Sequence, residues 1–427
     1  MAKGIKLLLL ITTGLFLMAI YNVSGLHIPP NERYEKSNQY MVDSGQLYNL
    51  PGFSGNNPGS GALSSNNEVI VIDDTVSSFE TMLALMESAT TSINIETFIL
   101  RDDAVGQRLK ETLIRKAGQG VTVRIIYDAW GSFFTSGKFM RDLENQGVRV
   151  VAFNPLAKAA FQGRLDNRMH SKIIVIDGTQ AIIGGQNFGN EYLGMDPKIG
   201  SWKGVNALFK GSAVSSLQQV FFKDWLLACG EKVMDKNEYP LPSDASNRVV
   251  SVVWGGPDSR SSNINNLYCG LANAATNTLH IETPYFLPDN ELLESLEKAS
   301  QRGVEVHLII PAHSDNRIDE LARLDYLEKL LQEGIKVSTY NHGYLHAKLI
   351  VVDASIAVVG SANFDKRSGA KNYESDAVIY DGEIAGQLDD VFLNDLEYSS
   401  SLTSESLKCG FFQRGWRKAA AILLNIV

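Results

Sequence analysis

Apolar residues along the chain follow a strand, helix, strand pattern that occurs twice. In each copy, a segment with the two-residue apolar alternation of a strand precedes a helical stretch, and a glycine then introduces a second strand. The first copy comprises residues 92–98, 107–117 and 120–126, and the second comprises residues 278–284, 291–300 and 303–309. Alternating strands and helices predict an α/β fold. Because the copies lie about 180 residues apart, we expect two homologous domains rather than a solenoid.

Each copy continues into a pair of strands joined by a turn. The apolar runs are residues 172–176 and 348–352, and the returning strands are residues 181–185 and 356–360. Asp177 and Asp353 mark the turns between them. A histidine, His170 or His346, lies two positions before the lysine that opens each run. Side chains two apart on a strand point to the same face, so we expect an imidazole and an ammonium together in each domain.

The residues that could carry chemistry recur at one constant offset of 176 residues. The first set is His170, Lys172, Asp177, Gly184 and Asn187, and the second is His346, Lys348, Asp353, Gly360 and Asn363. The chain contains seven histidines, so a shared pattern around two of them indicates a duplicated site. The other five histidines have no such pattern, and we expect them to be ordinary core or surface residues.

The pattern His-x-Lys-x4-Asp followed by Gly-Ser-x-Asn resembles the signature of the phospholipase D superfamily, which usually contains it twice. Within the superfamily the chain is similar to bacterial cardiolipin synthases, over roughly residues 68 to 398. The segments that carry this similarity are residues 168–192, 282–289 and 363–374. The resemblance implies two α/β/α domains of the phospholipase D type, related by pseudo-twofold symmetry, with one active site formed by both.

Cleavage of a phosphodiester needs a nucleophile, an acid for the leaving alcohol and positive charge near the phosphoryl oxygens. One histidine can attack phosphorus and form a phosphohistidine, while the other gives a proton to the leaving oxygen and later activates the acceptor. The candidate catalytic residues are His170, Lys172, Asp177, His346, Lys348 and Asp353, and the candidate substrate-binding residues are Asn187, Ser361 and Asn363.

Two groups of these candidates differ from the rest. Asp177 and Asp353 lie at strand ends, where a structural role in a turn or an ion pair is favoured over direct chemistry. Ser361 has Gly185 as its counterpart, so a hydroxyl is available in only one half.

The resemblance also implies an acidic residue downstream of each catalytic histidine. Glu374 has this place in the second half, whereas the first half has the run Trp202-Lys203-Gly204, without an acid unless Asp196 or Asn206 substitutes. A carboxylate stabilises an imidazolium. We therefore expect Glu374 to orient His346 as the general acid and a neutral His170 to be the nucleophile, with the reversed roles as the alternative.

The N-terminus has the features of an export signal. Lys3 and Lys6 precede the uncharged, mostly apolar run Leu7–Ile20, whose fourteen residues suit a signal-peptide core better than a membrane span. The run 23–25 could be a cleavage site. Because lysines before such a run stay in the cytoplasm, we expect a cleaved signal or a single anchor in the cytoplasmic membrane, with extracytoplasmic catalytic domains.

The expected organisation has five parts. They are a signal or membrane segment (1–26), a turn-rich linker (27–67), a first domain (68–245), a second domain (246–400) and a C-terminal tail (401–427). The tail combines aromatic, basic and apolar residues, which suits a membrane-interface helix or a helix packed on the body.

Bulk properties narrow the possible ligands. A net charge of −9 argues against general nucleic-acid binding, so affinity for phosphate must come from a few cations in a site. The three cysteines have neither metal-like nor disulfide-like spacing. The sequence contains no zinc, magnesium or nucleotide-binding motif, so we expect no metal and no cofactor.

The resemblance thus implies a membrane-bound phosphatidyltransferase that condenses two phosphatidylglycerols to cardiolipin and glycerol through a phosphatidyl-histidine. Its partners would be the membrane and a phosphatidylglycerol-like phospholipid, not a nucleic acid; the sequence does not indicate an oligomeric state. A phospholipase D that makes phosphatidic acid is the nearest alternative. An exported phosphodiesterase or nuclease is a third hypothesis, and a non-catalytic scaffold, suggested by Gly204, is a fourth.

Overall fold

The computed structural model describes residues 63–233, 238, 240, 246–258, 262–314 and 316–407. The expected signal segment, most of the linker and most of the C-terminal tail lie outside the described residues. Within the described part of the chain, every helix is too short or too polar to cross a bilayer. The first strand begins at Ser64, inside the segment expected to be linker.

A single sheet extends through both halves of the described chain; it has fifteen strands in one continuous order and a sixteenth, β5 (Arg168–Met169), which pairs with β19 (Asn372–Tyr380) off this order. In the first half the strand order is β1 (Ser64–Ile72), β9 (Asn206–Gly211), β7 (Gln180–Gly184), β6 (Ile173–Ile176), β2 (Ser92–Thr97), β3 (Thr122–Asp128) and β4 (Arg149–Phe153). In the second half it is β10 (Arg248–Gly255), β19 (Asn372–Tyr380), β17 (Ile356–Gly360), β16 (Leu349–Val352), β11 (Thr278–Glu282), β13 (Glu305–Pro311), β14 (Lys336–Tyr340) and β20 (Ser399–Ser401).

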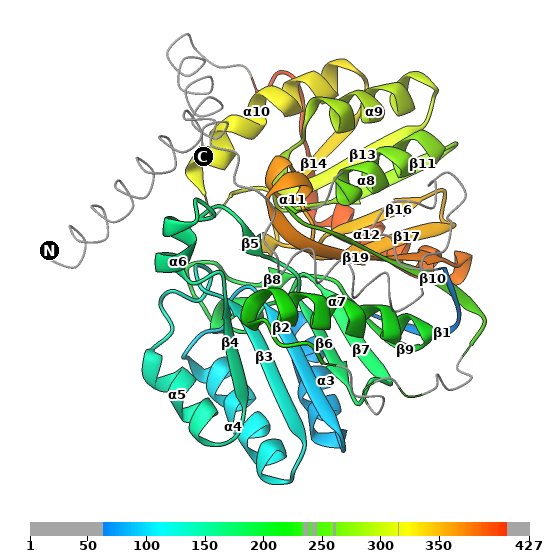
Figure 1. Ribbon diagram of the computed structural model, residues 1–427. Helices are drawn as coiled ribbons and strands as arrows, with labels where there is room; N and C mark the ends of the chain where they lie inside the picture. Colours follow the sequence, from blue (N-terminus) through cyan, green and yellow to red (C-terminus); the bar gives the residue numbers. More distant parts are fainter. Residues whose placement is uncertain are drawn as a thin grey trace, which may run out of the picture.

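The two halves have the same order of seven strands, counted outward from the junction of β1 and β10, and the second half adds β20 at its edge. Strands β1 and β10 pair antiparallel and join the halves into one sheet. The arrangement is the pseudo-twofold symmetry expected from the duplicated motif, and the prediction of two α/β domains is confirmed (Figure 1).

Helices cover both faces of the sheet. In the first half, α3 (Thr75–Ser88), α4 (Ala104–Gly118) and α5 (Gly137–Asn145) share one hydrophobic core with the sheet. In the second half, α8 (Asn263–Ala274), α9 (Asn290–Gln301) and α10 (Arg317–Gln332) do the same. On the opposite face, α7 (Ser212–Cys229) and α12 (Gly382–Glu397) contribute to a core that contains strands of both halves. Each half is therefore an α/β/α layer structure (Figure 1).

The strands after the two histidines are buried on both faces. On β6, Ile173 and Val175 belong to the core under α7, whereas Ile174 and Ile176 belong to the core under α3 and α4. On β16 the same alternation distributes the side chains between the core of α12 and that of α8 and α9. Two buried faces explain why these segments are continuously apolar.

The turn after each of these strands is fixed by its aspartate. The Asp177 carboxylate accepts hydrogen bonds from the backbone N–H groups of residues 90–92, each at 2.8 Å, and from the Thr90 hydroxyl at 2.8 Å. Asp353 accepts the equivalent four bonds from residues 276–278 at 2.7–2.9 Å. Both aspartates have positive φ, 53° and 51°, which their short polar side chains tolerate. Each aspartate therefore ties its turn to the start of β2 or β11.

We predict that Asp177→Asn and Asp353→Asn each lower the free energy of unfolding at pH 7 by about 1–3 kcal/mol, because the amide accepts fewer of these bonds and has no charge. Burial raises the pKa of both carboxyl groups, but the hydrogen bonds lower it by more than burial raises it. Each folded pKa therefore lies below its usual value. The stabilisation is then complete above the unfolded pKa and is lost as the pH falls through the folded pKa.

Urea denaturation at pH 7 and in acid measures this difference. The stability gap between variant and wild type should be present at pH 7 and should shrink in acid. Asp390→Asn, at an exposed position of α12, is the control and should change neither value. An equal gap at both pH values would contradict the role assigned to the carboxylates.

Candidate active site

Both histidine motifs lie where the two halves meet. Each histidine follows a two-residue strand, β5 (Arg168–Met169) or β15 (Tyr344–Leu345), and precedes β6 or β16. The sequence predicted that His170 and Lys172 share one face of a strand. This prediction is wrong, because both residues lie between β5 and β6. Instead the Lys172 ammonium donates to the backbone carbonyl of His170, and Lys348 donates to that of His346 at 2.8 Å. Both lysines are buried beside their histidine.

The halves are locked together through these short strands. Strand β5 of the first half pairs with β19 of the second, and β15 of the second half pairs with β8 (Trp202–Lys203) of the first. As a result, the backbone N–H of His170 donates to the Tyr373 carbonyl at 2.8 Å. The N–H of His346 donates to the Lys203 carbonyl at 2.7 Å. Each histidine is held by the backbone of the opposite half, and one shared site results.

Gly185 shows how closely the halves approach. A Cβ atom at this position would lie 3.1 Å from the His346 carbonyl oxygen and 3.2 Å from Cδ of Lys348. Both contacts are tighter than ordinary van der Waals distance, so a side chain here would press on the second motif. This explains why residue 185 is glycine although its counterpart in the second half, Ser361, has a side chain.

The second-half acid contacts the first-half histidine. Glu374 Oε2 lies 2.9 Å from His170 Nδ1. The expectation that Glu374 orients His346 is therefore wrong. The reason is the strand exchange: Met169 is paired with Tyr373, so the residues that follow them, His170 and Glu374, become neighbours.

Three further donors hold the Glu374 carboxylate. The hydroxyls of Ser361 and Ser368 donate to it at 2.6 and 2.7 Å, and the Asn372 amide donates at 3.1 Å. The carboxylate is buried, and this set of donors offsets part of the cost of burying it. The Ser361 hydroxyl thus supports Glu374, and its role in substrate binding stays a prediction.

His346 has no carboxylate in the equivalent place. Leu345 pairs with Lys203 as Met169 pairs with Tyr373, so Gly204 occupies the position that corresponds to Glu374. In the described part of the chain, the buried Nδ1 of His346 has no hydrogen-bond partner. The sequence correctly indicated that an acid is missing at Gly204. The histidine that lacks a carboxylate partner as a result is His346, not His170.

The two substitutes considered for this acid are engaged elsewhere. The Asn206 amide donates to Ser78 and Gln186, and an Asp196 carboxylate oxygen accepts from the N–H of Lys198.

Aromatic rings surround His346 instead of a carboxylate. The ring centroids of Trp202, Tyr344 and Tyr192 lie 5.0, 6.1 and 6.4 Å from that of His346. The faces of such rings favour a cation, so they can stabilise an imidazolium to a modest extent.

Burial and mutual repulsion control the charges in the site. Burial lowers the pKa of both histidines well below the usual value, and the cations of Lys172 and Lys348 lower it further. Burial also lowers the pKa of Lys172 to about 7, against the attraction of Glu374, and raises the pKa of Glu374. Both imidazoles are consequently neutral without a ligand at pH 7. A bound anion beside His346 would favour its protonation, because an opposite charge stabilises the charged form.

The remaining predicted residues divide into two groups. Asn187 and Asn363 lie buried in the site; the Asn187 oxygen accepts from the Ile99 N–H at 3.0 Å. The Asn363 side-chain oxygen has no partner among the described residues. Asp177 and Asp353 brace turns, as described above, which is the structural role that the sequence favoured over direct chemistry.

Sequence reasoning missed residues that support the site. Phe98 lies edge-on to the His170 ring, with centroids 5.0 Å apart, and its ring lies 5.5 Å below the Lys172 ammonium. Ser368 and Asn372 hold Glu374. Ser368 and Asn372 belong to the segment 363–374, whose resemblance to the family was a usable signal. Phe98, an aromatic residue after a strand, had no such signal in the sequence.

No cluster of three or more histidine, cysteine, aspartate or glutamate side chains suited to a metal ion occurs in the described ranges.

Comparisons with known proteins identify the family. A family model described as "Cardiolipin synthase, PLD-like domain" matches residues 82–225 and 268–396, one segment in each half. A cardiolipin synthase of Halalkalibacterium halodurans is 36% identical over 373 residues, which cover 87% of this chain and 72% of the relative. Cardiolipin synthase 2 of Bacillus anthracis is 36% identical over 326 residues, covering 76% of this chain and 63% of the relative. The chain thus spans less than two thirds of the second relative.

A solved structure shares the fold. The crystal structure of phosphatidylserine synthase from Haemophilus influenzae superposes with a TM-score of 0.65 at 15% identity, covering 93% of this chain and 98% of that one. At this identity the likeness concerns the fold alone.

We predict that Glu374→Gln lowers phosphodiester turnover by about 10²- to 10⁴-fold, because an amide cannot hold His170 in one tautomer as a carboxylate does. Ser368→Ala should give a smaller loss, since two other donors still hold Glu374. Steady-state kinetics on folded variants measures both effects. Ser295→Ala, which removes a buried hydroxyl bonded to a helix carbonyl, is the matched control. Wild-type turnover in Glu374→Gln would contradict the pairing.

Proposed function

The chain belongs to the family of cardiolipin synthases with phospholipase D-like domains, and on this premise we propose that it condenses two phosphatidylglycerols to cardiolipin and glycerol. The observation that carries the proposal is the pair of buried histidines, one from each half, with a carboxylate on His170 alone. This arrangement offers two groups with different protonation behaviour at one phosphate. The relatives are named cardiolipin synthases, which supports cardiolipin as the product.

His170 is the nucleophile in the proposed mechanism. When its Nδ1–H donates to Glu374, its Nε2 carries the lone pair that attack on phosphorus requires. Attack forms a P–N bond and breaks the P–O bond to the glycerol headgroup. This assigns His170 the role expected from the sequence, but for another reason: the carboxylate fixes its tautomer instead of being absent.

His346 moves the proton. The negative charge of the bound phosphodiester raises its pKa from the low value of the free site, so that it takes up a proton. It gives this proton to the departing glycerol oxygen, and then accepts one from a hydroxyl of the second phosphatidylglycerol. That oxygen attacks phosphorus, the P–N bond breaks, and cardiolipin leaves with His170 restored.

Fixed donors serve the phosphoryl oxygens. Lys172 and Lys348 lie buried on the two sides of the site, where charge acts most strongly. A bound phosphate favours the charged form of Lys172, whose pKa is lowered to about 7 in the free site. The oxygen of Asn187 is engaged with the backbone, so its amide N–H groups are the part that can donate to a phosphate.

We also propose that the protein acts at the membrane, with its catalytic domains outside the cytoplasm. The support is the sequence alone: Lys3 and Lys6 ahead of the apolar run Leu7–Ile20, which lies outside the described residues. A reporter active only outside the cytoplasm, fused after residue 67, should give signal. Signal from a cytoplasm-dependent reporter at that position would place the domains inside.

Purified full-length protein with phosphatidylglycerol in detergent should form cardiolipin and glycerol in equal amounts, because transfer to a second lipid releases one headgroup. Mass spectrometry of the lipids measures the product. Phosphatidic acid as the main product would indicate hydrolysis, and no product from any phospholipid would favour the scaffold hypothesis. His170→Ala should abolish turnover with the fold retained.

Acid-free trapping with phosphate-labelled phosphatidylglycerol identifies the nucleophile in the same reaction. The label should lie on the peptide that contains His170, since that histidine has the carboxylate. His346→Asn should still be labelled by a substrate whose leaving group needs no proton. Label on the His346 peptide would reverse the two roles.

A further inference from the structure

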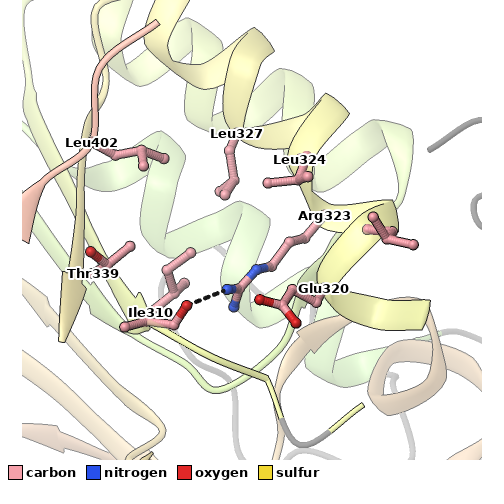
Figure 2. Close-up of a pocket in the computed structure, with 9 residues that line it drawn as sticks. Ile310, Glu320, Arg323, Leu324, Leu327, Thr339 and Leu402 are labelled. Carbon is pink, nitrogen blue, oxygen red and sulfur yellow. Dashed lines mark hydrogen bonds between the residues drawn. The ribbon is translucent and has the colours of Figure 1, made fainter. Parts of the chain in front are cut away.

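A cavity of about 350 Å³ lies in the second half, outside the catalytic residues. It is bounded by α10 on one side and by the ends of β13 and β14 on the other (Figure 2). Its walls are mainly apolar and include Ile310, Leu324, Leu327 and Leu402. Its volume falls in the range of pockets that hold small organic ligands, roughly 300–1,000 Å³.

A buried arginine points into this apolar space. Arg323 is only 5% exposed, and one of its terminal nitrogens donates to the Ala312 carbonyl at 3.4 Å. Its Nε and Nη1 atoms are buried and have no hydrogen-bond partner in the described part of the chain. A guanidinium remains charged in proteins, and burying its donors without partners is costly. Two donors of Arg323 therefore remain open to an anionic ligand, although the charges of Glu320 and Asp319 attract the guanidinium from a greater distance.

Glu320 does not fill that place. It also lines the cavity near Arg323, as Figure 2 shows, but no ion pair within 4.0 Å joins the two in the described residues. Its carboxylate instead lies 3.8 Å from Nδ1 of the exposed His313, and its side chain is 35% exposed. The glutamate thus belongs to the outer side of the cavity, and the arginine to the inner side.

The rim of the cavity is apolar as well. Leu321 of α10 lines the cavity and is 37% exposed, and Ile318 of the same helix, which does not line it, is 38% exposed. A ligand that approaches over such a rim and ends at a cation combines an apolar chain with an anionic head.

We propose that the cavity binds one acyl chain of a phospholipid whose phosphate is held by Arg323. The anionic head follows from Arg323 and the acyl chain from the walls and rim; the choice of a phosphate head rests on the proposed function. The site is distinct from the catalytic one, since none of the motif histidines or lysines lines the cavity. It adjoins the second motif, because Arg323 is close enough to Tyr344 to interact electrostatically, and Tyr344 packs against Trp202 beside His346.

Dodecyl phosphate, used below its micelle concentration with the full chain, is the probe that tests the proposal. Isothermal titration should show that dodecyl phosphate binds. The affinity for uncharged dodecanol and the affinity for inorganic phosphate should each be lower by about tenfold or more. Equal affinity for dodecanol would show that Arg323 takes no part. Tighter binding of dodecanoate would indicate a fatty-acid site and overturn the phosphate head.

Two variants locate the probe in the cavity. Arg323→Met keeps the length of the side chain and removes its charge, and Leu324→Phe fills the cavity; each should weaken binding by about tenfold or more. The matched controls on the same helix are Lys329→Met, at an exposed ion pair, and Leu331→Phe, which packs outside the cavity, and both should bind normally. Unchanged affinity in both cavity variants would refute the proposal.

A further variant separates this site from the catalytic one. Lys348→Met removes a cation of the catalytic site and should leave dodecyl phosphate binding intact, so lost binding in this variant would mean that the probe binds there instead. Because the assay measures binding without turnover, its outcome does not depend on which reaction the protein catalyses. Binding seen only after deletion of residues 408–427 would show that the tail fills the cavity, and would overturn the proposal.

Discussion

The exchange of two short strands between the halves is the interaction on which the rest of the site depends. Strands β5 and β15 contain two residues each, yet each pairs with a strand of the opposite half and delivers a histidine to it. The backbone bonds of His170 to Tyr373 and of His346 to Lys203 fix both imidazoles against the opposite half. Each histidine is therefore positioned by backbone contacts with the opposite half. The β1–β10 pairing, which makes the sheet continuous, keeps the partners in register for this exchange.

The same exchange makes the site chemically asymmetric. It places the residue after Tyr373 beside His170 and the residue after Lys203 beside His346; the first is Glu374 and the second is Gly204. One histidine consequently has a carboxylate held by three donors, and the other lies among aromatic rings. A fold with twofold pseudosymmetry thus presents two histidines with different tautomer control. Two identical imidazoles would have to divide the roles of nucleophile and acid by the substrate's orientation alone.

The sequence predicted the features of the fold and site that depend on neighbouring residues, but not the contacts that depend on tertiary strand pairing. Strands, helices and the turns at Asp177 and Asp353 follow from periodicity and turn chemistry, and the motif offset identified His170 and His346. The partner of Glu374 was assigned wrongly, because sequence order places it nearer to His346, whereas the contact is set by tertiary strand pairing. The hydrogen bond from Ser361 to Glu374 was not foreseen for the same reason. Arg323 stands on a helix of ordinary composition, and only its burial against an apolar cavity distinguishes it.

The spacing within the motif has a structural cause that connects its two ends. The four-residue strand β6 lies between Lys172 and Asp177, and β16 lies likewise between Lys348 and Asp353. Each strand is buried on both faces, so it cannot slip without exposing apolar residues or burying polar ones. At its far end the aspartate ties the turn to β2 or β11, and at its near end the lysine bonds to the histidine carbonyl. The aspartate therefore acts on the chemistry through a rigid strand: it fixes the strand's position along the sheet, and with it the position of the ammonium and the imidazole. A residue that contacts no substrate can thus be as much a part of the motif as the nucleophile.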